Sequence, residues 1–174
     1  MLKLKKLTLR NWGYIRKADL EFPESGLVLV VGNNSVATGG KFQSIGAGKT
    51  LIGEAISRAM AGVNGRFTSL GWYANEQEGS KNMLVNVLAD VDGKALNVSM
   101  GYKCPELSRT GEGFKFTFDG KEVHRAKIDA TRQELYDLLK ISPELAEWSV
   151  FLDGDKLSFS SLSEKRAVEL LMTA

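Results

Sequence analysis

The segment that most constrains the fold of this chain is a glycine-rich stretch between two apolar ones. Residues 26–32, GLVLVVG, are continuously apolar and β-branched, a pattern typical of a strand buried on both faces. Between residues 51 and 60 apolar side chains recur at helical spacing, and Gly62 then provides a natural stop. We therefore predict a buried strand, a glycine-rich loop and an amphipathic helix in succession, an arrangement that binds phosphate through backbone amides.

The loop ends in GAGKT, residues 46–50, the second half of the phosphate-binding motif G-x-x-x-x-G-K-[ST]. Fixed spacing would place the first glycine of the motif where the chain has Gln43. The motif is restored if Gly32-Asn33-Asn34 begins the loop and residues 35–45 are an excursion from it, because loop length costs free energy only slowly. The lysine of GAGKT would then bind the outer phosphates of a nucleotide, and its threonine would bind magnesium. The alternative is a GAGKT that occurs by chance at a helix start.

Hydrolysis needs further groups. A self-sufficient enzyme of this type holds magnesium with an acid at the end of a second buried strand and orients the attacking water. The chain has no run of four apolar residues followed by Asp-Glu. The nearest match is Val150-Phe151-Leu152-Asp153, and a weaker strand ends at Asp90. These residues predict nucleotide binding with only part of the hydrolytic machinery.

Much of the remaining chain predicts antiparallel strands. Residues 2–10 and 18–22 alternate apolar and polar side chains and form a strand pair, with a phase slip at Lys5-Lys6 that indicates a bulge. Two hairpins follow, with Asp-Gly turns at residues 92–93 and 119–120.

The two hairpins form a β-rich insert over residues 80–126, which we expect to be a sub-structure separate from the strand–loop–helix unit. Residues 104–113, CPELSRTGEG, are expected to be the loop between the hairpins, and residues 66–81 a polar surface loop. The three tryptophans are expected to be packing residues rather than platforms for a nucleotide base.

Helices are predicted after the insert. Thr131-x-x-Glu134 has the form of a capping box, and Ser142-Pro143-Glu144 is a typical helix start. Residues 162–174 begin a further amphipathic helix with no stop signal inside the pattern.

Charge and cysteine usage limit the function classes. The net charge is only +2, but six basic residues precede the first acid, Asp19. They form either a face that meets phosphates or a solvated edge strand protected by lysine, and they are Lys3, Lys5, Lys6, Arg10, Arg16 and Lys17. The single Cys104 excludes an intramolecular disulfide and indicates a reducing compartment. No signal peptide or membrane-length apolar run is present, so we expect a soluble cytoplasmic protein without membrane contact.

In order along the chain, four features resemble the SbcC-type, SMC-like ATPases of DNA double-strand-break repair and recombination, a family that includes phage-encoded members. The opening LKLKKLTLRNWGYIRKADLEF is similar to the N-terminal strand pair of that family, and SGLVLVVGNN with the later GAGKT is similar to its nucleotide loop. The β-rich insert resembles the lobe that covers one face of the head domain. WSVFLDGDKLSFSSLSEKRAVELL resembles the stretch that leads from the Q-loop into the coiled coil.

The resemblance implies an α/β fold, the N-terminal lobe of a P-loop NTPase head of the ABC type, with the β-rich antiparallel insert. Residues 1–174 would be one part of that head, because the family assembles it from the two ends of a long chain. Its segments would be a strand pair, P-loop and helix over 1–65, the insert over 80–126, helices and the Q-loop over 127–160, and the start of the helix leading to the coiled coil over 161–174.

The resemblance also implies roles for individual residues. Lys49 would bind the β- and γ-phosphates of ATP, Thr50 would ligate Mg²⁺, and Arg10 and Asn11 would approach the base and ribose. The loop that surrounds the phosphates would be formed by Gly32, Asn33, Asn34, Gly46, Ala47 and Gly48.

One departure from the family concerns its Q-loop, where a glutamine usually senses magnesium and the attacking water. The matching stretch here is LDGDK, so Asp153 or Asp155 would take the catalytic position, with Asp153 as a second magnesium ligand. The alternative is that these acids only form a turn before a helix.

The partners implied are the C-terminal half of the same head, a second head, an SbcD-type nuclease and double-stranded DNA. Three other interpretations stay open. The chain could belong to an SMC-, RecF- or RecN-like clamp or loader without a nuclease, to a self-contained small P-loop kinase that uses Asp153, or to a non-catalytic interaction module.

Overall fold

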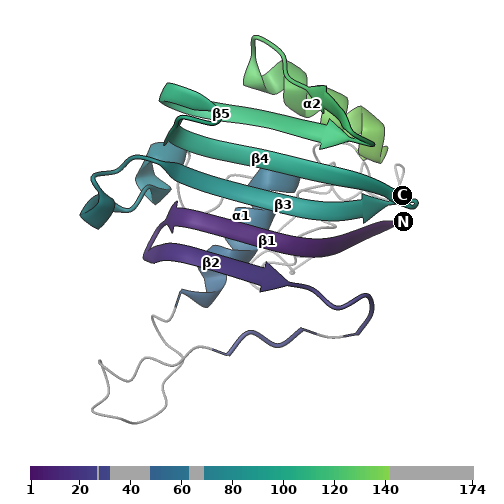
Figure 1. Cartoon of the computed structure of the whole chain (residues 1–174), viewed down its shortest axis with the longest axis horizontal. Coiled ribbons are helices and arrows are strands. Elements are labelled where there is room, and N and C mark those ends of the chain that lie inside the picture. The colour runs from purple at the N-terminus through teal and green to yellow at the C-terminus, as the bar shows by residue number, and fades with distance from the viewer. Residues whose placement is uncertain (27, 32–47, 63–68, 142–174) are drawn as a thin grey trace, which may run out of the picture.

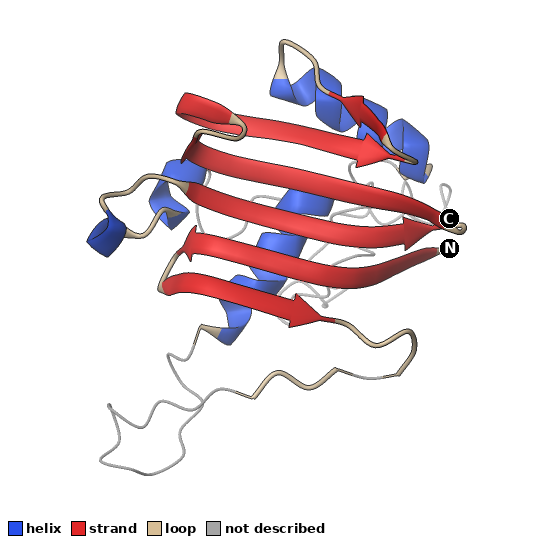
Figure 2. Cartoon of the chain, viewed as in Figure 1, coloured by secondary structure: helices blue, strands red, loops and turns tan. Residues whose placement is uncertain are grey.

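The computed structural model describes residues 1–26, 28–31, 48–62 and 69–141, and its main element is one six-stranded antiparallel sheet (Figure 1). The strand order is β2-β1-β3-β4-β5-β6, and every neighbouring pair is antiparallel. In these ranges two α-helices, α1 and α2, and two short 3-10 helices, η1 and η2, accompany the sheet (Figure 2). The strands are β1 (Leu2–Trp12), β2 (Ile15–Glu21), β3 (Met83–Val91), β4 (Lys94–Cys104), β5 (Ser108–Phe118) and β6 (Lys121–Val123).

The strand pair and both hairpin turns are confirmed. Asp92-Gly93 and Asp119-Gly120 link their strands as two-residue turns in which both residues have positive φ, the combination that matches the twist of a hairpin. The pairing of β1 with β3 shifts register between Leu4 and Lys6, so the predicted bulge is also confirmed.

The β-rich insert is not a separate sub-structure, and that prediction was wrong. β3 pairs with β1 along most of its length, from Leu2 opposite Val91 to Arg10 opposite Leu84. The side chains of β1 and β3 that face α1 therefore form one continuous apolar layer. Alternation along each strand predicts that a face is buried but does not identify the neighbouring strand.

The predicted loop over residues 104–113 was also wrong in large part, because β4 runs to Cys104 and β5 begins at Ser108. Only a tight turn separates these strands, closed by the bond from the Leu107 amide to the Cys104 carbonyl. Packing explains why this polar segment is rich in glycine. A Cβ on Gly113 would lie 2.7 Å from the Leu107 Cβ, so glycine is needed where the turn folds back over the strand.

Helix α1 (Lys49–Ala61) lies behind the sheet in Figure 1 and packs against β1, β3 and β4. Most of its buried apolar residues are those that the helical spacing predicts, with Ala61 in addition, and it ends at Gly62 with φ of 64°, so helix and stop are both confirmed. The core between α1 and the sheet contains Leu7, Leu9, Leu51, Ala55, Ala59, Val85, Val87 and Val98.

Helix α2 (Ile128–Leu139) packs against β5 and the C-terminal end of α1. It begins one turn earlier than the capping box predicts, so that prediction was wrong. Thr131 is buried inside the helix, where its hydroxyl donates to the Lys127 carbonyl and accepts from the Arg125 amide. Glu134 pairs with the Arg125 side chain rather than with a helix-start amide. Thr131 and Glu134, which resemble a capping box in sequence, thus hold the segment before α2 against the helix.

The buried strand predicted over residues 26–32 is not observed in its described part. Residues 28–31 belong to no strand, and Leu29 and Val31 are 80% and 72% exposed. Their apolar, β-branched composition favours extended backbone, but a buried strand also needs hydrogen-bonded neighbours and a covering layer on each face. No described strand pairs with this segment, which we call the apolar run 28–31.

Candidate functional site

The start of α1 carries the described part of the predicted nucleotide site. Gly48 precedes the helix in the left-handed conformation, with φ of 76°, and the Leu51 amide donates to its carbonyl. The N-cap residue is a glycine and so supplies no capping side chain, and the first turn contains no acid that would offset the partial positive charge of the helix terminus. Lys49 is half-buried and Thr50 is exposed at the same point. Anionic oxygens are the groups that such a terminus stabilises.

Seven of the predicted site residues lie outside the described residues. They are Gly32, Asn33, Asn34, Gly46 and Ala47 of the loop, and Asp153 and Asp155 of the Q-loop region. The structure therefore brings together Gly48, Lys49 and Thr50 and neither supports nor opposes the roles of the others. Among the residues that it does describe, no three His, Cys, Asp or Glu side chains gather in a way that could hold a metal ion.

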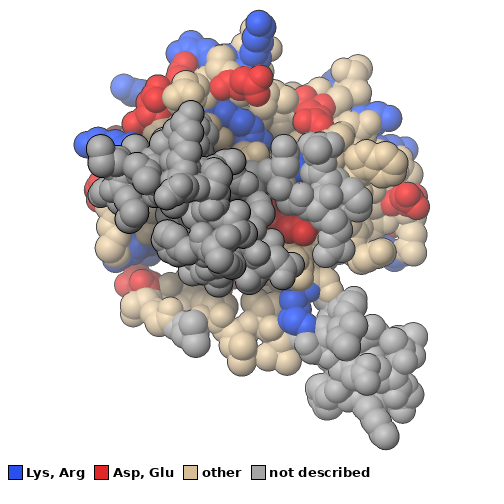
Figure 3. Space-filling model, turned by 180° about the vertical axis from the view of Figure 1, so that it is seen from behind, with Lys and Arg blue, Asp and Glu red and all other residues tan. Residues whose placement is uncertain are grey.

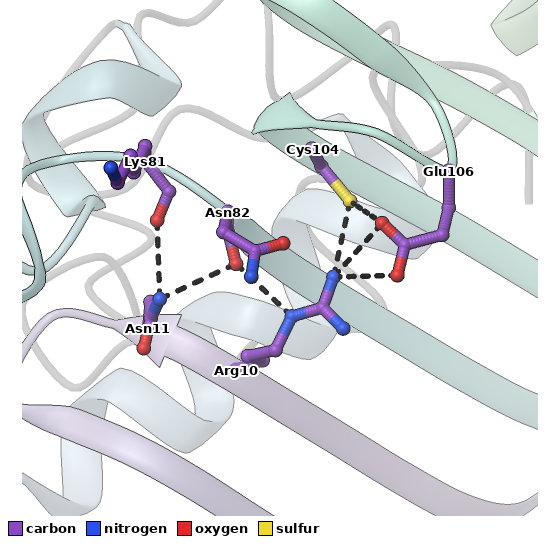
Figure 4. A network of polar contacts seen from close by, with 6 residues as sticks. All are labelled: Arg10, Asn11, Lys81, Asn82, Cys104 and Glu106. Atoms are coloured by element: carbon purple, nitrogen blue, oxygen red, sulfur yellow. Dashed lines mark hydrogen bonds and ion pairs between the residues drawn. The ribbon is translucent and has the colours of Figure 1, made fainter.

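Arg10 and Asn11 take part in a network of protein contacts at the end of β1 (Figure 4). The Arg10 guanidinium donates to both carboxylate oxygens of Glu106, at 2.9 and 3.0 Å, and to the Asn82 carbonyl at 3.1 Å. The Asn11 side-chain amide donates to the Lys81 carbonyl at 3.1 Å. These contacts engage both side chains with protein groups. The approach of Arg10 and Asn11 to a base and ribose stays a prediction.

The same network sets the protonation of two groups. The Cys104 thiol donates to Glu106, and together with Arg10 this bond lowers the pKa of Glu106 from 4.5 to about 2. Burial raises the pKa of Cys104, which is fully buried, so the thiol stays protonated and is a poor nucleophile. This cluster is therefore a structural anchor for the end of β1.

The structure places two further residues beside the start of α1, Trp12 and Tyr73, which the sequence did not connect with the site. Their rings stack face to face, with centroids 4.3 Å apart and an interplanar angle of 2°, and both are buried. The Trp12 indole N–H donates to the Leu51 carbonyl, in the first turn of α1, at 2.8 Å. Trp12 is the packing residue expected, whereas Trp72 is 72% exposed and contradicts that expectation. Tyr73 was hidden in a stretch of loop-like composition, which the structure folds into η1 (Leu70–Tyr73) and η2 (Glu76–Glu78).

The N-terminal basic residues are largely matched by acids. Lys5 pairs with Glu24, Lys6 with Asp19, Arg10 with Glu106, and Arg16 with Glu78. Where the described residues are visible from behind the sheet, basic and acidic side chains are interspersed (Figure 3). Of the two alternatives, these pairs favour a solvated surface over a phosphate-binding face. The sheet order places β2 at the edge and β1 inside.

A cavity of about 410 Å³ lies at the other end of α1, against α2. Its walls carry charges of both signs, from Arg58 and Arg132 and from Glu112 and Asp129. Helix α1 has 13 residues and is about 20 Å long, so this cavity is well separated from Lys49 and Thr50. Its mixed charge does not select an anionic ligand.

Comparison with known proteins adds no further constraint. No protein-family model matches this chain, and no curated protein matches it in sequence. Within the described ranges, no helix has the length and apolar character needed to cross a membrane.

Proposed function

We propose that this chain is the ATP-binding N-terminal half of an SbcC-like ATPase head, cytoplasmic, with the ABC-type P-loop fold. It would complete its head with a C-terminal half, pair with a second head over double-stranded DNA, and regulate an SbcD-type nuclease. The observation that carries the proposal is the position of Gly48-Lys49-Thr50 at the start of a helix packed under an antiparallel sheet.

Two further features support a head completed by another segment. The antiparallel sheet covers one side of α1, as the resemblance implies for the lobe on one face of the head. The apolar run 28–31 is exposed, although its composition is that of a doubly buried strand. Strand partners and a covering layer from the C-terminal half would remove that apolar surface from water.

The chemistry at this site follows from the residue types. ATP and Mg²⁺ fit the described end of α1, because its helix terminus and the Lys49 ammonium favour phosphate while the Thr50 hydroxyl is a ligand type that magnesium accepts. Bound Mg²⁺ would neutralise charge on the outer phosphates. Lys49 would hold those phosphates, and Asp153 or Asp155 would orient the attacking water in the assembled head.

Nucleotide binding by the 174-residue chain tests the proposal. We expect weak MgATP binding, reduced at least tenfold by Lys49→Ala, because a charge-assisted contact to phosphate contributes about 1.5–3 kcal/mol. Thr50→Ala should lower the magnesium dependence of binding. The matched control is Lys94→Ala, which removes an exposed lysine from the first position of β4 and should leave binding unchanged. Equilibrium dialysis with ATP at several Mg²⁺ concentrations measures all four proteins.

The same samples separate the other interpretations. Turnover should be negligible, because the C-terminal half supplies the missing acids, and robust turnover that Asp153→Ala abolishes would instead establish a self-contained enzyme. MgATP binding that Lys49→Ala leaves unchanged would favour an interaction module. A clamp or loader without a nuclease would bind ATP in the same way, and co-purification of the complete head with a nuclease distinguishes it.

A further inference from the structure

The end of β1 is joined directly to the first turn of α1 by Trp12. Its indole N–H donates to the Leu51 carbonyl at 2.8 Å, two residues after Lys49. Trp12 is completely buried, so this hydrogen bond lies where water cannot replace it. The neighbouring turn reinforces the contact, because a Cβ on Gly13 would lie only 2.7 Å from the Leu51 Cδ1. The start of the helix thus has little room to move relative to β1.

Trp12 is itself held in place by Tyr73. The two rings stack, and the Gly13 amide donates to the Tyr73 carbonyl. The Arg58 guanidinium, from the third turn of α1, lies 5.3 Å from the centroid of the Tyr73 ring. The stacked pair therefore contacts α1 in its first and third turns. These two contacts restrain the position and the tilt of α1 against the sheet.

We infer that Trp12 is a positioning residue of the nucleotide site, which fixes Lys49 and Thr50 through its hydrogen bond to the Leu51 carbonyl; this inference rests on the proposed function. Phosphate contacts require donors held within a fraction of an ångström, and side chains that support the site from behind provide that precision. Arg10 and Asn11 support the same position, because they anchor the last residues of β1 to the β4–β5 turn and to the segment before β3. The phosphate end of α1 is thereby held against an end of β1 that is itself fixed on both of these neighbouring segments.

Trp12→Phe tests the inference, because it keeps an aromatic ring on Tyr73 and removes the N–H donor. We expect the affinity for MgATP to fall about fivefold, which corresponds to about 1 kcal/mol at 1.4 kcal/mol per tenfold. The matched control is Trp72→Phe, the same change at a residue that is 72% exposed and adjacent to Tyr73, and it should leave affinity unchanged. Lys49→Ala is measured beside them.

A second readout requires no substitution in the bound protein and separates positioning from a merely structural role. In ¹⁵N-labelled wild-type protein, saturation with MgATP should shift the indole N–H resonance of Trp12 more than that of Trp72. This is expected because nucleotide oxygens polarise the helix turn whose carbonyl accepts the bond. The resonance is assigned by its absence in Trp12→Phe, or by through-bond experiments if that variant does not fold.

The outcomes distinguish the positioning role of Trp12 from the proposed nucleotide site itself. If Lys49→Ala loses MgATP while folded Trp12→Phe stays within twofold of wild type, the positioning role is wrong and the nucleotide site stands. An unmoved Trp12 indole resonance in saturated wild-type protein also overturns the positioning role. If Lys49→Ala binds as wild type does, the proposed function fails, and the inference fails with it.

Discussion

At the scale of single residues, the Arg10–Glu106–Cys104 cluster is a group of polar side chains that stabilises the fold. Glu106 accepts from the Cys104 thiol and from Arg10, and both bonds favour its charged form. The pKa of Glu106 is therefore about 2 in the folded protein, below its ordinary 4.5. Such a group stabilises the fold fully above pH 4.5, and the contribution is lost as pH falls through 4.5 toward 2.

Glu106→Gln should consequently lower the free energy of unfolding at pH 7 and matter less in acid. Because Glu106 is about half exposed, we expect a difference of about 1 kcal/mol or less at pH 7. Urea unfolding at pH 7, 5, 4 and 3 measures the difference. In an Arg10→Gln background the effect should shrink, since the two residues interact directly. A difference between wild type and Glu106→Gln that stays constant from pH 7 to pH 3 would show that the carboxylate is not the cause.

Residue types alone predicted the chemistry of Lys49 and Thr50 but could not predict the surroundings of Arg10 and Asn11. Those side chains are satisfied by Lys81, Asn82 and Glu106, which lie seventy or more positions away along the chain. Local pattern carries no information about such partners. The contact of Trp12 with α1 was not predicted for a related reason. Its acceptor is a backbone carbonyl, and residue types do not indicate which carbonyl a side chain will reach.

At the scale of elements, the helix ends and turns use glycine for two different purposes. Gly62 and Gly93 both have positive φ, at 64° and 83°. A Cβ at Gly93 would meet nothing within 4 Å, whereas one at Gly62 would lie 2.6 Å from the Tyr136 hydroxyl and 2.8 Å from the Arg132 Nη1. Those two groups donate to the last carbonyls of α1, at Ala61 and Arg58. Gly62 therefore provides space as well as conformation.

Substitution by alanine should separate these two contributions. We expect Gly93→Ala to cost about 1 kcal/mol of stability, from backbone strain alone. Gly62→Ala should cost about 2–4 kcal/mol, because the clash adds to the strain and disturbs both helix-end bonds. Chemical denaturation of the two variants under identical conditions gives the comparison. Equal losses would mean that the contacts around Gly62 adjust without cost.

Elements with a strong local signal were predictable, and those defined by distant partners were not. The Asp-Gly turns, the bulge at Lys5-Lys6 and the stop at Gly62 all follow from local backbone preferences. The strand extensions around residues 104–113 were hidden by polar, glycine-rich composition that serves the packing of Leu107. The start of α2 was misplaced because a buried threonine and a paired glutamate imitate a capping box.

At the scale of the whole molecule, the apolar run 28–31 is the feature in which sequence and structure differ most. Its pattern predicts full burial, and the structure exposes it. An apolar pattern indicates that a segment is suited to burial. It does not identify the segment or chain that provides the covering layers. The same reasoning explains why the P-loop fold stays a proposal while the antiparallel sheet is observed.

A pair of matched substitutions checks the exposure of this run. Leu29→Ala should change the free energy of unfolding by less than about 0.5 kcal/mol, because Leu29 is 80% exposed. Leu9→Ala, at a fully buried position of β1, should cost about 2–5 kcal/mol. Thermal and urea unfolding of both variants provide the values. A loss at Leu29 comparable to that at Leu9 would show that the run is buried in the folded chain.

The pairing of β1 with β3 has a consequence for biosynthesis. Residue 2 lies beside residue 91, and residue 10 lies beside residue 84, so β1 is completed by a strand that is made much later. At roughly 5–20 residues per second, β1 and β2 leave the ribosome several seconds before β3 follows. A two-stranded hairpin is barely stable alone, and during this interval β1 has a hydrogen-bonded neighbour on one edge only. In nascent chains the other edge of β1, from residue 2 to residue 10, therefore stays without its strand partner until β3 emerges.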